Sequence, residues 1–477
     1  MTSQEIKNLE KKVSQSIEKL HFPNYESEEH SRYVVRKKNY SSVLIKRIPY
    51  LFTCNETNKL VCLQNYSILI EGDEIKAVAP PEEKIEEDRF DLIYDASKRG
   101  GTVVTPGFIN AHAHSPMYFL RSSMFLDEGE NLGATLSKLP VWESKMNAEE
   151  LTLSAIGDLT EQQKFGVTTT LSHYNNFESL DQAARLTGQN VINAISVASH
   201  VSPKNSPQLI EDLMEKERTF SKLAMAVHYL YKASPEVLRK VQSLIEKNNL
   251  LFTCHFAETK GVVKKNFQIH GESEVAVLDR YGLLNKKTLV SHAVHLGSEE
   301  IAKLVKGKVG VVHLPTSNQI HKSGTFPFWN FHKAGGFDRI GLGTDSVISK
   351  SRLDILTEAY HTRITHLYLK TVKFGSLFKM MTINGARILG EEKKGRIVPG
   401  MKADLVFWKL KDRGFIPFDE KNPFSLIGNL ITHSGRTARD VMVGGRFVIK
   451  DRRHQKIDES KLLETTQNWH MRLRGKV

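Results

Sequence analysis

The stretch Thr105-Pro-Gly-Phe-Ile-Asn-Ala-His-Ala-His-Ser-Pro116 places two histidines, His112 and His114, at the end of an apolar run. Residues i and i+2 of a β-strand point to the same side, so both imidazoles would face one direction. Two imidazoles on one strand end can bind a single ion together. The stretch therefore suggests a strand that carries metal ligands where it ends.

Strand-like and helix-like patterns alternate after this stretch. Apolar, β-branched runs such as GVTTTLSHY (166–174) and LLFTCHFAE (250–258) are separated by helical patterns such as SPEVLRKVQSLIEKNN (234–249). Eight such strands, most of them followed by a helix, predict an α/β fold of the (β/α)8 TIM-like barrel type over residues 105–387. A doubly wound open sheet would give the same alternation, but no glycine-rich phosphate motif follows the first strand.

Short alternating strands flank the predicted barrel on both sides. Residues 42–104 and 388–452 are expected to form one small β-sandwich built from both ends of the chain. Apolar residues recur at three- and four-residue spacing within residues 1–22, so residues 1–41 are expected to be an N-terminal helical extension. Residues 453–477 are expected to form a C-terminal helical tail.

The composition is that of an ordinary globular enzyme. The chain has 477 residues, of which 40% are hydrophobic and 25% charged. No apolar run approaches the roughly 18 residues that a membrane-spanning helix needs. The first residues do not resemble a signal peptide, and three cysteines cannot make a disulfide framework. We therefore expect a cytoplasmic protein without a membrane partner.

The net charge of +13 raises the question of a polyanionic partner. The basic clusters are short, and neither an aromatic-interleaved RNA-binding motif nor zinc-finger spacing accompanies them. We expect a solvated basic surface and no nucleic-acid partner. An anionic substrate stays open.

Polar side chains stand at the ends of the predicted strands, where the C-terminal mouth of a barrel carries its chemistry. A third histidine from the fifth strand and a carboxylate from the eighth would join His112 and His114. Imidazole together with carboxylate suits zinc or iron, and such a set leaves one coordination position open for catalysis. The strand-end residues are His112, His114, His173, His228, His255, Glu258, His292, His313 and Asp345.

Several motifs occur in the order seen in the amidohydrolase superfamily. They are PGFINAHAHSPM (106–117), HFAET (255–259), SHAVHL (291–296), LPTSNQI (314–320), LGTDS (342–346), TINGARILG (382–390) and KGRIVPGMKADLV (394–406). The chain resembles this superfamily from about residue 42 to residue 452. The most similar branch is that of the aminohydrolases, which includes methylthioadenosine/S-adenosylhomocysteine deaminases and triazine chlorohydrolases.

This resemblance implies a site and a reaction. His112, His114, His255 and Asp345 would hold one divalent metal ion, expected to be zinc with iron as the alternative. Asp345 would also accept a proton from the metal-bound water, Glu258 would be the proton shuttle, and His292 would stabilise the developing charge. Superfamily members with two metals carry a bridging lysine or glutamate at the end of the fourth strand. This chain has AVHYL there (226–230), which favours one ion.

The resemblance also implies a substrate class. Glu143 and His228 match substrate-binding positions, whereas Ala134 replaces an expected aromatic residue. We expect a hydrolytic deaminase that releases ammonia from an amino-substituted heterocycle, such as a purine, nucleoside or pterin, by attack of a metal-bound hydroxide. The alternative is a hydrolase that cleaves a C–Cl, C–S or cyclic amide or amidine C–N bond. The partners would be this small molecule and further copies of the chain in a dimer or larger homo-oligomer.

Overall fold

The structure is a computed structural model that describes residue 4 and residues 32–121, 139–197, 206–215, 219–348 and 352–476. The helix predicted over residues 1–22 lies outside the described residues, apart from residue 4. Within the described ranges, no helix is both long enough and apolar enough to cross a membrane.

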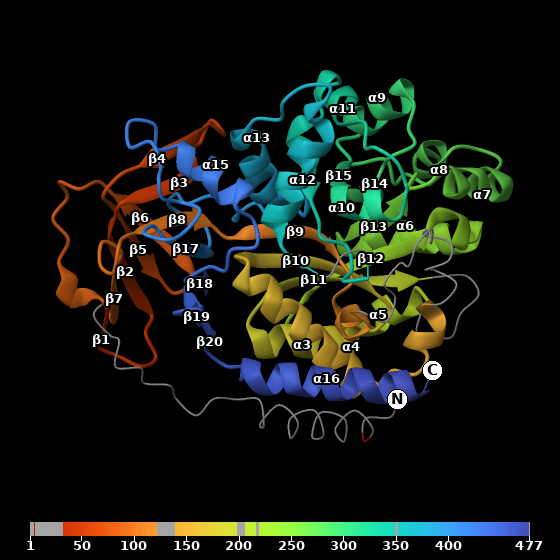
Figure 1. The fold of residues 1–477 in the computed structure, drawn as a ribbon. Helices are drawn as coiled ribbons and strands as arrows, with labels where there is room; N and C mark the ends of the chain where they lie inside the picture. Colours follow the sequence, from red (N-terminus) through yellow and green to blue (C-terminus); the bar gives the residue numbers. More distant parts are fainter. Residues whose placement is uncertain are drawn as a thin grey trace.

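The centre of the molecule is a parallel eight-stranded barrel (Figure 1). Its strands follow one another in chain order around the sheet. They are β9 (Phe108–Ala113), β10 (Val167–Tyr174), β11 (Asn190–Val197), β12 (Lys222–Tyr229), β13 (Leu251–Phe256), β14 (Thr288–His292), β15 (Gly310–His313) and β16 (Ile340–Leu342). Side chains of these strands are buried along nearly their whole length, as expected for parallel strands covered by helices.

The first and last barrel strands meet next to the two histidines of the opening stretch. The backbone N–H groups of Thr344 and Asp345 both donate to the carbonyl oxygen of His112, at 3.0 Å each. An isolated bridge also joins Ala113 to Asp345. This contact closes the sheet, so the predicted barrel is confirmed and the open doubly wound alternative is wrong.

Helices connect the strands and cover the outside of the barrel. Their starts follow local sequence signals: Asn147 and Glu150 form a reciprocal capping box at α3, and Ser234 caps α6 ahead of Pro235. The connecting helices are η3 (Ser115–Leu120), α3 (Ala148–Lys164), α4 (Phe177–Thr187), α5 (Gln208–Glu215), η5 (Leu230–Lys232), α6 (Pro235–Asn248), α7 (Lys260–His270), α8 (Glu274–Arg280), α9 (Ser298–Lys306), α10 (Pro315–Ile320), α11 (Phe328–Lys333), η6 (Phe337–Arg339), α12 (Ile355–Leu367), α13 (Phe374–Lys379), η7 (Met380–Asn384) and α14 (Gly385–Ile388).

Two further sheets lie beside the barrel, as expected for a β-sandwich. One has the order β1 (Tyr33–Val35), β7 (Leu92–Asp95), β2 (Ser42–Ile48), β5 (Tyr66–Glu71), β6 (Glu74–Ala79). The other has the order β20 (Arg453–His454), β19 (Arg446–Lys450), β18 (Asp440–Val443), β17 (Leu405–Lys409), β8 (Thr102–Pro106), β3 (Tyr50–Cys54), β4 (Leu60–Leu63). Strand β17 pairs with both β8 and β18, so the two ends of the chain share one sheet, as predicted.

The sandwich has its own apolar core and is attached to the barrel at the start of β9. The Tyr94 and Phe407 rings, from opposite sheets, lie 4.9 Å apart. Trp408 of β17 stacks on Phe108 of β9 at 5.8 Å and donates its ring N–H to Thr105 at 3.1 Å. This contact fixes the start of β9, and with it the direction in which the two histidines leave the strand.

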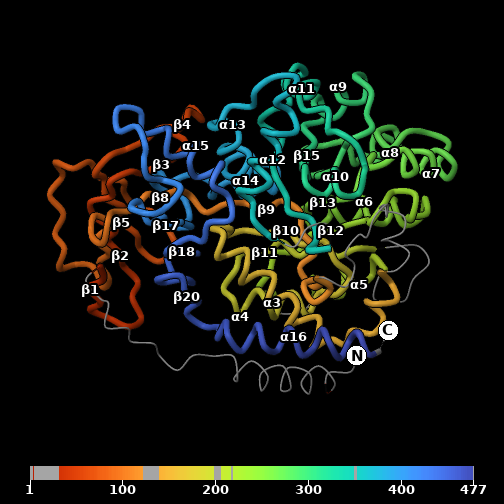
Figure 2. Tube along the Cα trace, viewed as in Figure 1, coloured from red at the N-terminus to blue at the C-terminus, as the bar shows by residue number. Residues whose placement is uncertain are grey.

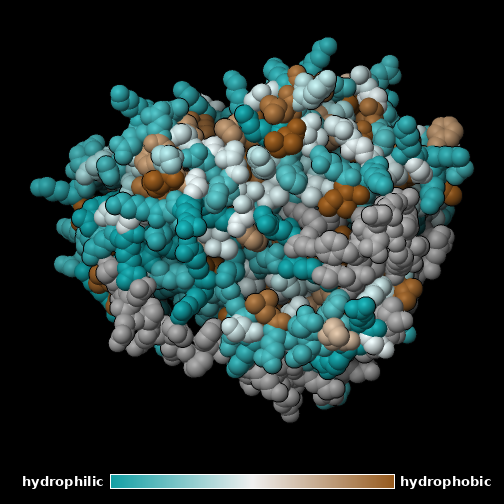
Figure 3. Space-filling view, viewed as in Figure 1, coloured by the Kyte–Doolittle hydropathy of each residue, from teal (hydrophilic) through white to brown (hydrophobic). Residues whose placement is uncertain are grey.

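The last helix, α16 (Glu459–Lys476), runs along the outside of α3 and α4 (Figure 2). His470 of α16 donates from Nδ1 to the carbonyl of Phe119 at 2.8 Å, and Trp469 packs on the Phe119 ring at 5.9 Å. A short helix, η2 (Glu87–Arg89), and α15 (Ser425–Thr432) complete the described elements. The surface seen in Figure 3 is largely hydrophilic, with hydrophobic residues in small separate patches.

Candidate active site

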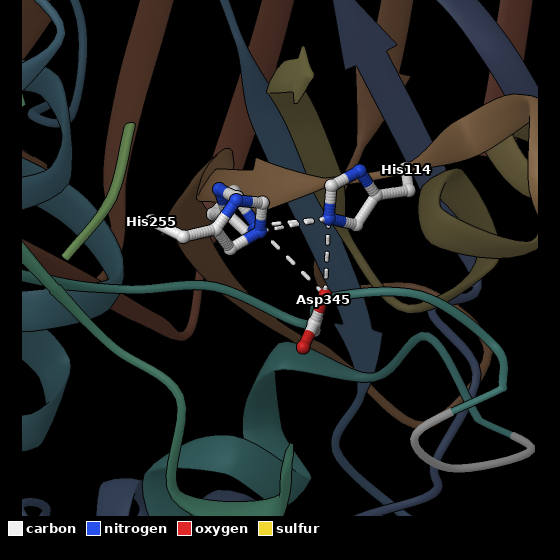
Figure 4. A group of neighbouring side chains, drawn as sticks. His114, His255 and Asp345 are labelled. Atoms are coloured by element: carbon white, nitrogen blue, oxygen red, sulfur yellow. Dashed lines mark hydrogen bonds and ion pairs between the residues drawn. The ribbon is translucent and has the colours of Figure 1, made fainter. Parts of the chain in front are cut away.

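Four side chains converge at the C-terminal mouth of the barrel. His112 lies in β9 and His114 directly follows that strand, His255 lies in β13, and Asp345 stands three residues after the end of β16. The Nε2 atom of His114 lies 3.2 Å from that of His112, 3.3 Å from that of His255 and 3.3 Å from Oδ1 of Asp345. Figure 4 shows the His114 and His255 rings pointing toward one another and toward the Asp345 carboxylate. All four residues are buried.

The Nδ1 atoms of the three imidazoles point outward and have partners of their own. Nδ1 of His114 donates to the carbonyl of His173 at 2.6 Å, and Nδ1 of His255 donates to the carbonyl of His228 at 2.9 Å. Nδ1 of His112 lies 2.9 Å from the Ser291 hydroxyl. Protons on Nδ1 leave the Nε2 lone pairs directed at the common centre, which is how second partners orient metal-ligating histidines.

The spacing and chemistry of this cluster fit a divalent cation. Two ligands about 2.0–2.1 Å from a tetrahedral zinc ion lie about 3.3–3.4 Å apart, close to the distances between the Nε2 atoms. Burial, followed by the neighbouring imidazoles, lowers the pKa of His112 and of His255 well below its usual value. Both rings are therefore neutral at pH 7, which is the form that binds a metal.

Asp345 supplies the negative charge of the cluster. Burial acts to raise its pKa, but the hydrogen bond and charge of His114 outweigh burial and hold the pKa well below its usual value. The same pair raises the pKa of His114 against the opposite effect of burial. Ser317 donates its hydroxyl to Oδ2 of Asp345, which leaves Oδ1 directed at the three imidazoles. Asp345 also has a φ of 59°, a strained conformation for a non-glycine residue that persists at functional sites.

Glu258 and His292 lie next to the four-residue cluster. Oε2 of Glu258 accepts a hydrogen bond from the Tyr229 hydroxyl at 2.6 Å, and Oε1 lies 3.8 Å from Nε2 of His292. Nδ1 of His292 lies 2.8 Å from Oδ1 of Asn318, and the His292 and His255 rings stack at 5.3 Å. Glu258 and His292 are almost fully buried. A carboxylate and an imidazole therefore face the same small space beside the cluster.

The two predicted substrate-binding residues lie at the rim of this space. His228 is half-buried, and its ring is 4.7 Å from that of His255 and 4.6 Å from that of Tyr229. Glu143 is also half-buried, and its Oε1 accepts from the Tyr174 hydroxyl at 2.6 Å. Burial raises the pKa of Glu143, and this hydrogen bond opposes it. Ala134 lies outside the described residues.

The structure adds residues that the sequence argument did not select. Tyr229, Ser291, Ser317 and Asn318 hold Glu258, His112, Asp345 and His292, respectively. Each of them lies within one of the motifs AVHYL (226–230), SHAVHL (291–296) and LPTSNQI (314–320). The only sequence signal for them was therefore a hydroxyl or amide side chain within a motif of the site.

Two other strand-end histidines differ in where they lie. The ring of His173 is 5.5 Å from that of His114 and 5.9 Å from that of His228, so His173 lines the same space. His313 instead pairs with His366 at 3.3 Å and stacks on Phe326.

The Cys254 thiol is fully buried, and burial raises its pKa well above the usual range. A thiol in this form is a poor nucleophile.

Comparison with known proteins settles the family. The model of the amidohydrolase family matches residues 103–448, more than half of the chain. The chain belongs to the amidohydrolase family. The superfamily and the hydrolase class predicted from the sequence are thus confirmed.

Relatives within the amidohydrolase family cover most of the chain. A 5-methylthioadenosine/S-adenosylhomocysteine deaminase of Pyrococcus furiosus is 30% identical over 390 residues, which are 78% of this chain and 89% of that protein. The enzyme of the same name from Pyrococcus abyssi is 29% identical over 415 residues, 84% of this chain and 93% of that protein.

Solved structures of amidohydrolases share the fold. An adenosine deaminase from Xanthomonas campestris with bound zinc gives a TM-score of 0.81 at 22% identity, covering 91% of this chain and 98% of that one. A triazine hydrolase from Arthrobacter aurescens gives a TM-score of 0.80 at 19% identity, covering 90% and 99%. At these identities the likeness is one of fold.

Proposed function

We propose that this amidohydrolase is a metal-dependent hydrolytic deaminase that releases ammonia from an amino-substituted heterocycle. The observation that carries the proposal is the convergence of three imidazole Nε2 atoms and one carboxylate oxygen beside a buried Glu258–His292 pair. The related proteins named as methylthioadenosine/S-adenosylhomocysteine deaminases support the reaction type.

His112, His114, His255 and Asp345 would hold one divalent ion, for which we propose zinc. Imidazole and carboxylate are ligands that zinc accepts, and the structurally similar adenosine deaminase contains zinc. When bound, the ion lowers the pKa of a coordinated water toward about 7 and so supplies a nucleophile at neutral pH.

The chain's own residues would move the protons. Glu258, whose Oε1 lies 3.8 Å from Nε2 of His292, would take a proton from the attacking water and deliver it to the ring nitrogen beside the departing amine. Asn318 holds Nδ1 of His292, so a proton on Nε2 of His292 can be donated only into the site, where it stabilises the developing charge. Asp345, whose Oδ1 lies 3.3 Å from Nε2 of His114, would accept the second proton of the attacking water, and this proton would leave with ammonia.

Substrate orientation would depend on Glu143 and His228. The Glu143 carboxylate can accept from hydroxyl groups of a ribose-like substituent while Tyr174 holds it in place. His228 has its ring close to Tyr229 and His255, where it can contact the ring system of the substrate. Purines and nucleosides with an exocyclic amine are therefore the first substrates to test, followed by pterins.

A second reaction is favoured by the fold of the triazine hydrolases. The same residues would serve a hydrolysis that displaces chloride or a thiol, or that opens a cyclic amide or amidine. The two reactions differ in their products, because only deamination releases ammonia from an intact ring.

The deciding experiment combines metal analysis with a product screen. We expect about one zinc per chain, and ammonia release from at least one amino-purine, nucleoside or pterin. Glu258→Gln is expected to lower the rate by about 10²–10⁴-fold with the metal content unchanged. Chloride or thiol release without ammonia would establish the alternative, and full activity of Glu258→Gln would overturn the proton-transfer role.

We also propose a homo-oligomer located in the cytoplasm, and a chain divided into a composite β unit (42–104 with 388–452) and a barrel unit (105–387). Light scattering during gel filtration tests the first point, and a monomer at micromolar concentration would refute it. Fluorescent tagging tests the location, and limited proteolysis tests the unit boundaries.

A further inference from the structure

A cavity lies at the end of the barrel opposite the histidine cluster. Its volume is about 630 Å³, within the range of small-molecule sites. It is lined by residues at or just before the starts of four barrel strands: Lys222 of β12, Leu251 of β13, Lys287 before β14 and Arg339 before β16. Because the barrel strands are parallel, their starts lie together at the end that does not carry the catalytic cluster.

The lining of this cavity is strongly basic. Only two of its residues, Glu391 and Glu392, are acidic. Seven are cationic, and like charges around one space repel one another. The seven are Lys222, Lys286, Lys287, Arg339, Arg387, Lys394 and Arg396.

Some of these charges are neutralised within the protein. Lys222 and Lys394 both bind the Glu391 carboxylate, with Nζ to oxygen distances of 2.5 and 3.2 Å. Arg387 pairs with Asp338 at 3.3 Å. These pairs account for three of the cations.

The other four cations have only neutral partners. Lys287 donates to the Asn249 amide oxygen, and Arg396 donates to Asn58 at 2.6 Å. Among the residues that the structure describes, no carboxylate lies within 4 Å of the cationic groups of Lys286, Lys287, Arg339 or Arg396. The cavity therefore keeps an excess of positive charge.

Arg339 connects the basic residues to one another. Its guanidinium donates to the carbonyl of Lys286 at 3.1 Å and to that of Arg387 at 3.5 Å. Its Nε is buried and has no hydrogen-bond partner within the described ranges. Burial lowers the pKa of Arg339, so its charge is less stable here than in water. A bound anion would supply the missing acceptor and the missing charge.

We propose that this cavity binds an oligophosphate, either inorganic or the phosphate tail of a nucleotide. Four cations without a carboxylate within 4 Å, among the residues that the structure describes, match the charge of a chain of about three phosphates better than that of one carboxylate or one phosphate. The volume also exceeds the need of a single phosphate. Guanidinium and ammonium groups are the side chains that proteins use for phosphate oxygens. The site is independent of the reaction proposed at the other end of the barrel.

The test is calorimetric titration of the full chain at low salt with tripolyphosphate and, separately, with ATP. The main variant is Lys286→Gln/Lys287→Gln, because both side chains are at least partly exposed and the fold should tolerate the change. Lys84→Gln/Lys98→Gln removes the same charge from exposed sandwich positions and is the matched control. Arg339→Gln is a second variant, accompanied by a melting curve. His255→Ala removes a predicted metal ligand and so excludes binding of the probe to an ion at the catalytic end.

We expect tripolyphosphate to bind the wild type and His255→Ala alike. Binding should be at least about tenfold weaker in Lys286→Gln/Lys287→Gln and unchanged in Lys84→Gln/Lys98→Gln. Tighter binding of ATP than of tripolyphosphate would assign the site to a nucleotide, and equal binding would assign it to a bare oligophosphate. The proposal is overturned if neither probe binds below millimolar concentration, if both lysine pairs behave alike, or if His255→Ala abolishes binding.

Discussion

The two ends of the barrel gather charged and polar groups in opposite ways. At the C-terminal mouth, Nε2 atoms of three buried imidazoles and one carboxylate oxygen point at a common centre. At the other end, lysine and arginine side chains surround a cavity, with backbone carbonyls and one glutamate as their main partners. The first set offers lone pairs and suits a cation, whereas the second offers N–H donors and suits an anion.

The chemistry of each cluster depends on the hydrogen-bond partners that hold its side chains from outside. The Nδ1 atoms of the three histidines at the mouth contact Ser291 and two backbone carbonyls, so the lone pairs on their Nε2 atoms point at the common centre. At the end with the basic cavity, the guanidinium of Arg339 donates to the backbone carbonyls of Lys286 and Arg387. The outer contacts determine which atoms remain available inside.

The largest effect is expected at the metal cluster. His255→Ala removes one of four convergent ligands, so activity should fall at least about a thousandfold together with the metal content. His295→Ala is the matched control, because His295 lies nearby but donates from Nε2 to the Ser323 carbonyl. Activity assays and elemental analysis of both variants test this, and a His255→Ala enzyme with full metal and activity would contradict it.

A smaller effect is expected one contact further out. Ser291→Ala removes the hydroxyl that lies 2.9 Å from Nδ1 of His112, so metal affinity should fall by about 10–100-fold while the fold is retained. Competition with a chelator measures the affinity. Ser144→Ala, at an exposed position near Glu143, should leave the affinity unchanged. Equal affinities in both variants would show that the Ser291 contact does not orient the ligand.

Tyr229→Phe tests the support of Glu258. The change removes a 2.6 Å hydrogen bond to Oε2 while keeping the ring, so kcat should fall about tenfold with little change in KM. Steady-state kinetics on the substrate found in the product screen measure both constants. Tyr368→Phe is the control, since the Tyr368 side chain is almost fully exposed. A large change in KM at constant kcat would instead place Tyr229 in substrate binding.

The smallest effect concerns stability and pH. Burial raises the pKa of Glu274 from 4.5 to about 8, while its carboxylate accepts from the backbone N–H of Ala257 at 2.9 Å. The folded state thus holds a proton more tightly than the unfolded state, so this group's contribution to stability falls as pH rises from about 4.5 to about 8. Glu274→Gln should reduce that fall by about 1–3 kcal/mol.

Denaturation curves at pH 5 and pH 8 test the Glu274 prediction. Glu299→Gln, an exposed change on α9, should follow the wild type. An unchanged pH dependence in Glu274→Gln would show that Glu274 is ionised in the folded protein.

The periodic patterns of the sequence predicted the barrel and a gathering of strand-end residues at its mouth, and the family resemblance selected His112, His114, His255 and Asp345 among them. Parallel strands bring their ends to one mouth, so residues that end strands must meet there. The roles assigned to Glu258, His292, Glu143 and His228 stay predictions until variants are measured.

Other contacts depended on rotamers and loop paths that no pattern encodes. The partners of the site residues, Tyr229 and Ser291 among them, could not be selected because a hydroxyl next to a motif has no fixed direction. His173 was named only as a strand-end residue and not as part of the site, yet its ring lies beside that of His114 because β10 is the immediate neighbour of β9. The basic cavity combines strand starts with residues more than 100 positions away in the chain.

The contact between α16 and η3 has a consequence for how the enzyme matures. Phe119 lies five residues after His114, and its carbonyl is bound by His470. The first ligand-bearing loop is thus braced by residues that leave the ribosome some 350 positions later. A nascent chain that has already formed its barrel would still lack this contact. Substitutions in α16 are therefore expected to alter the position of the segment that follows His114.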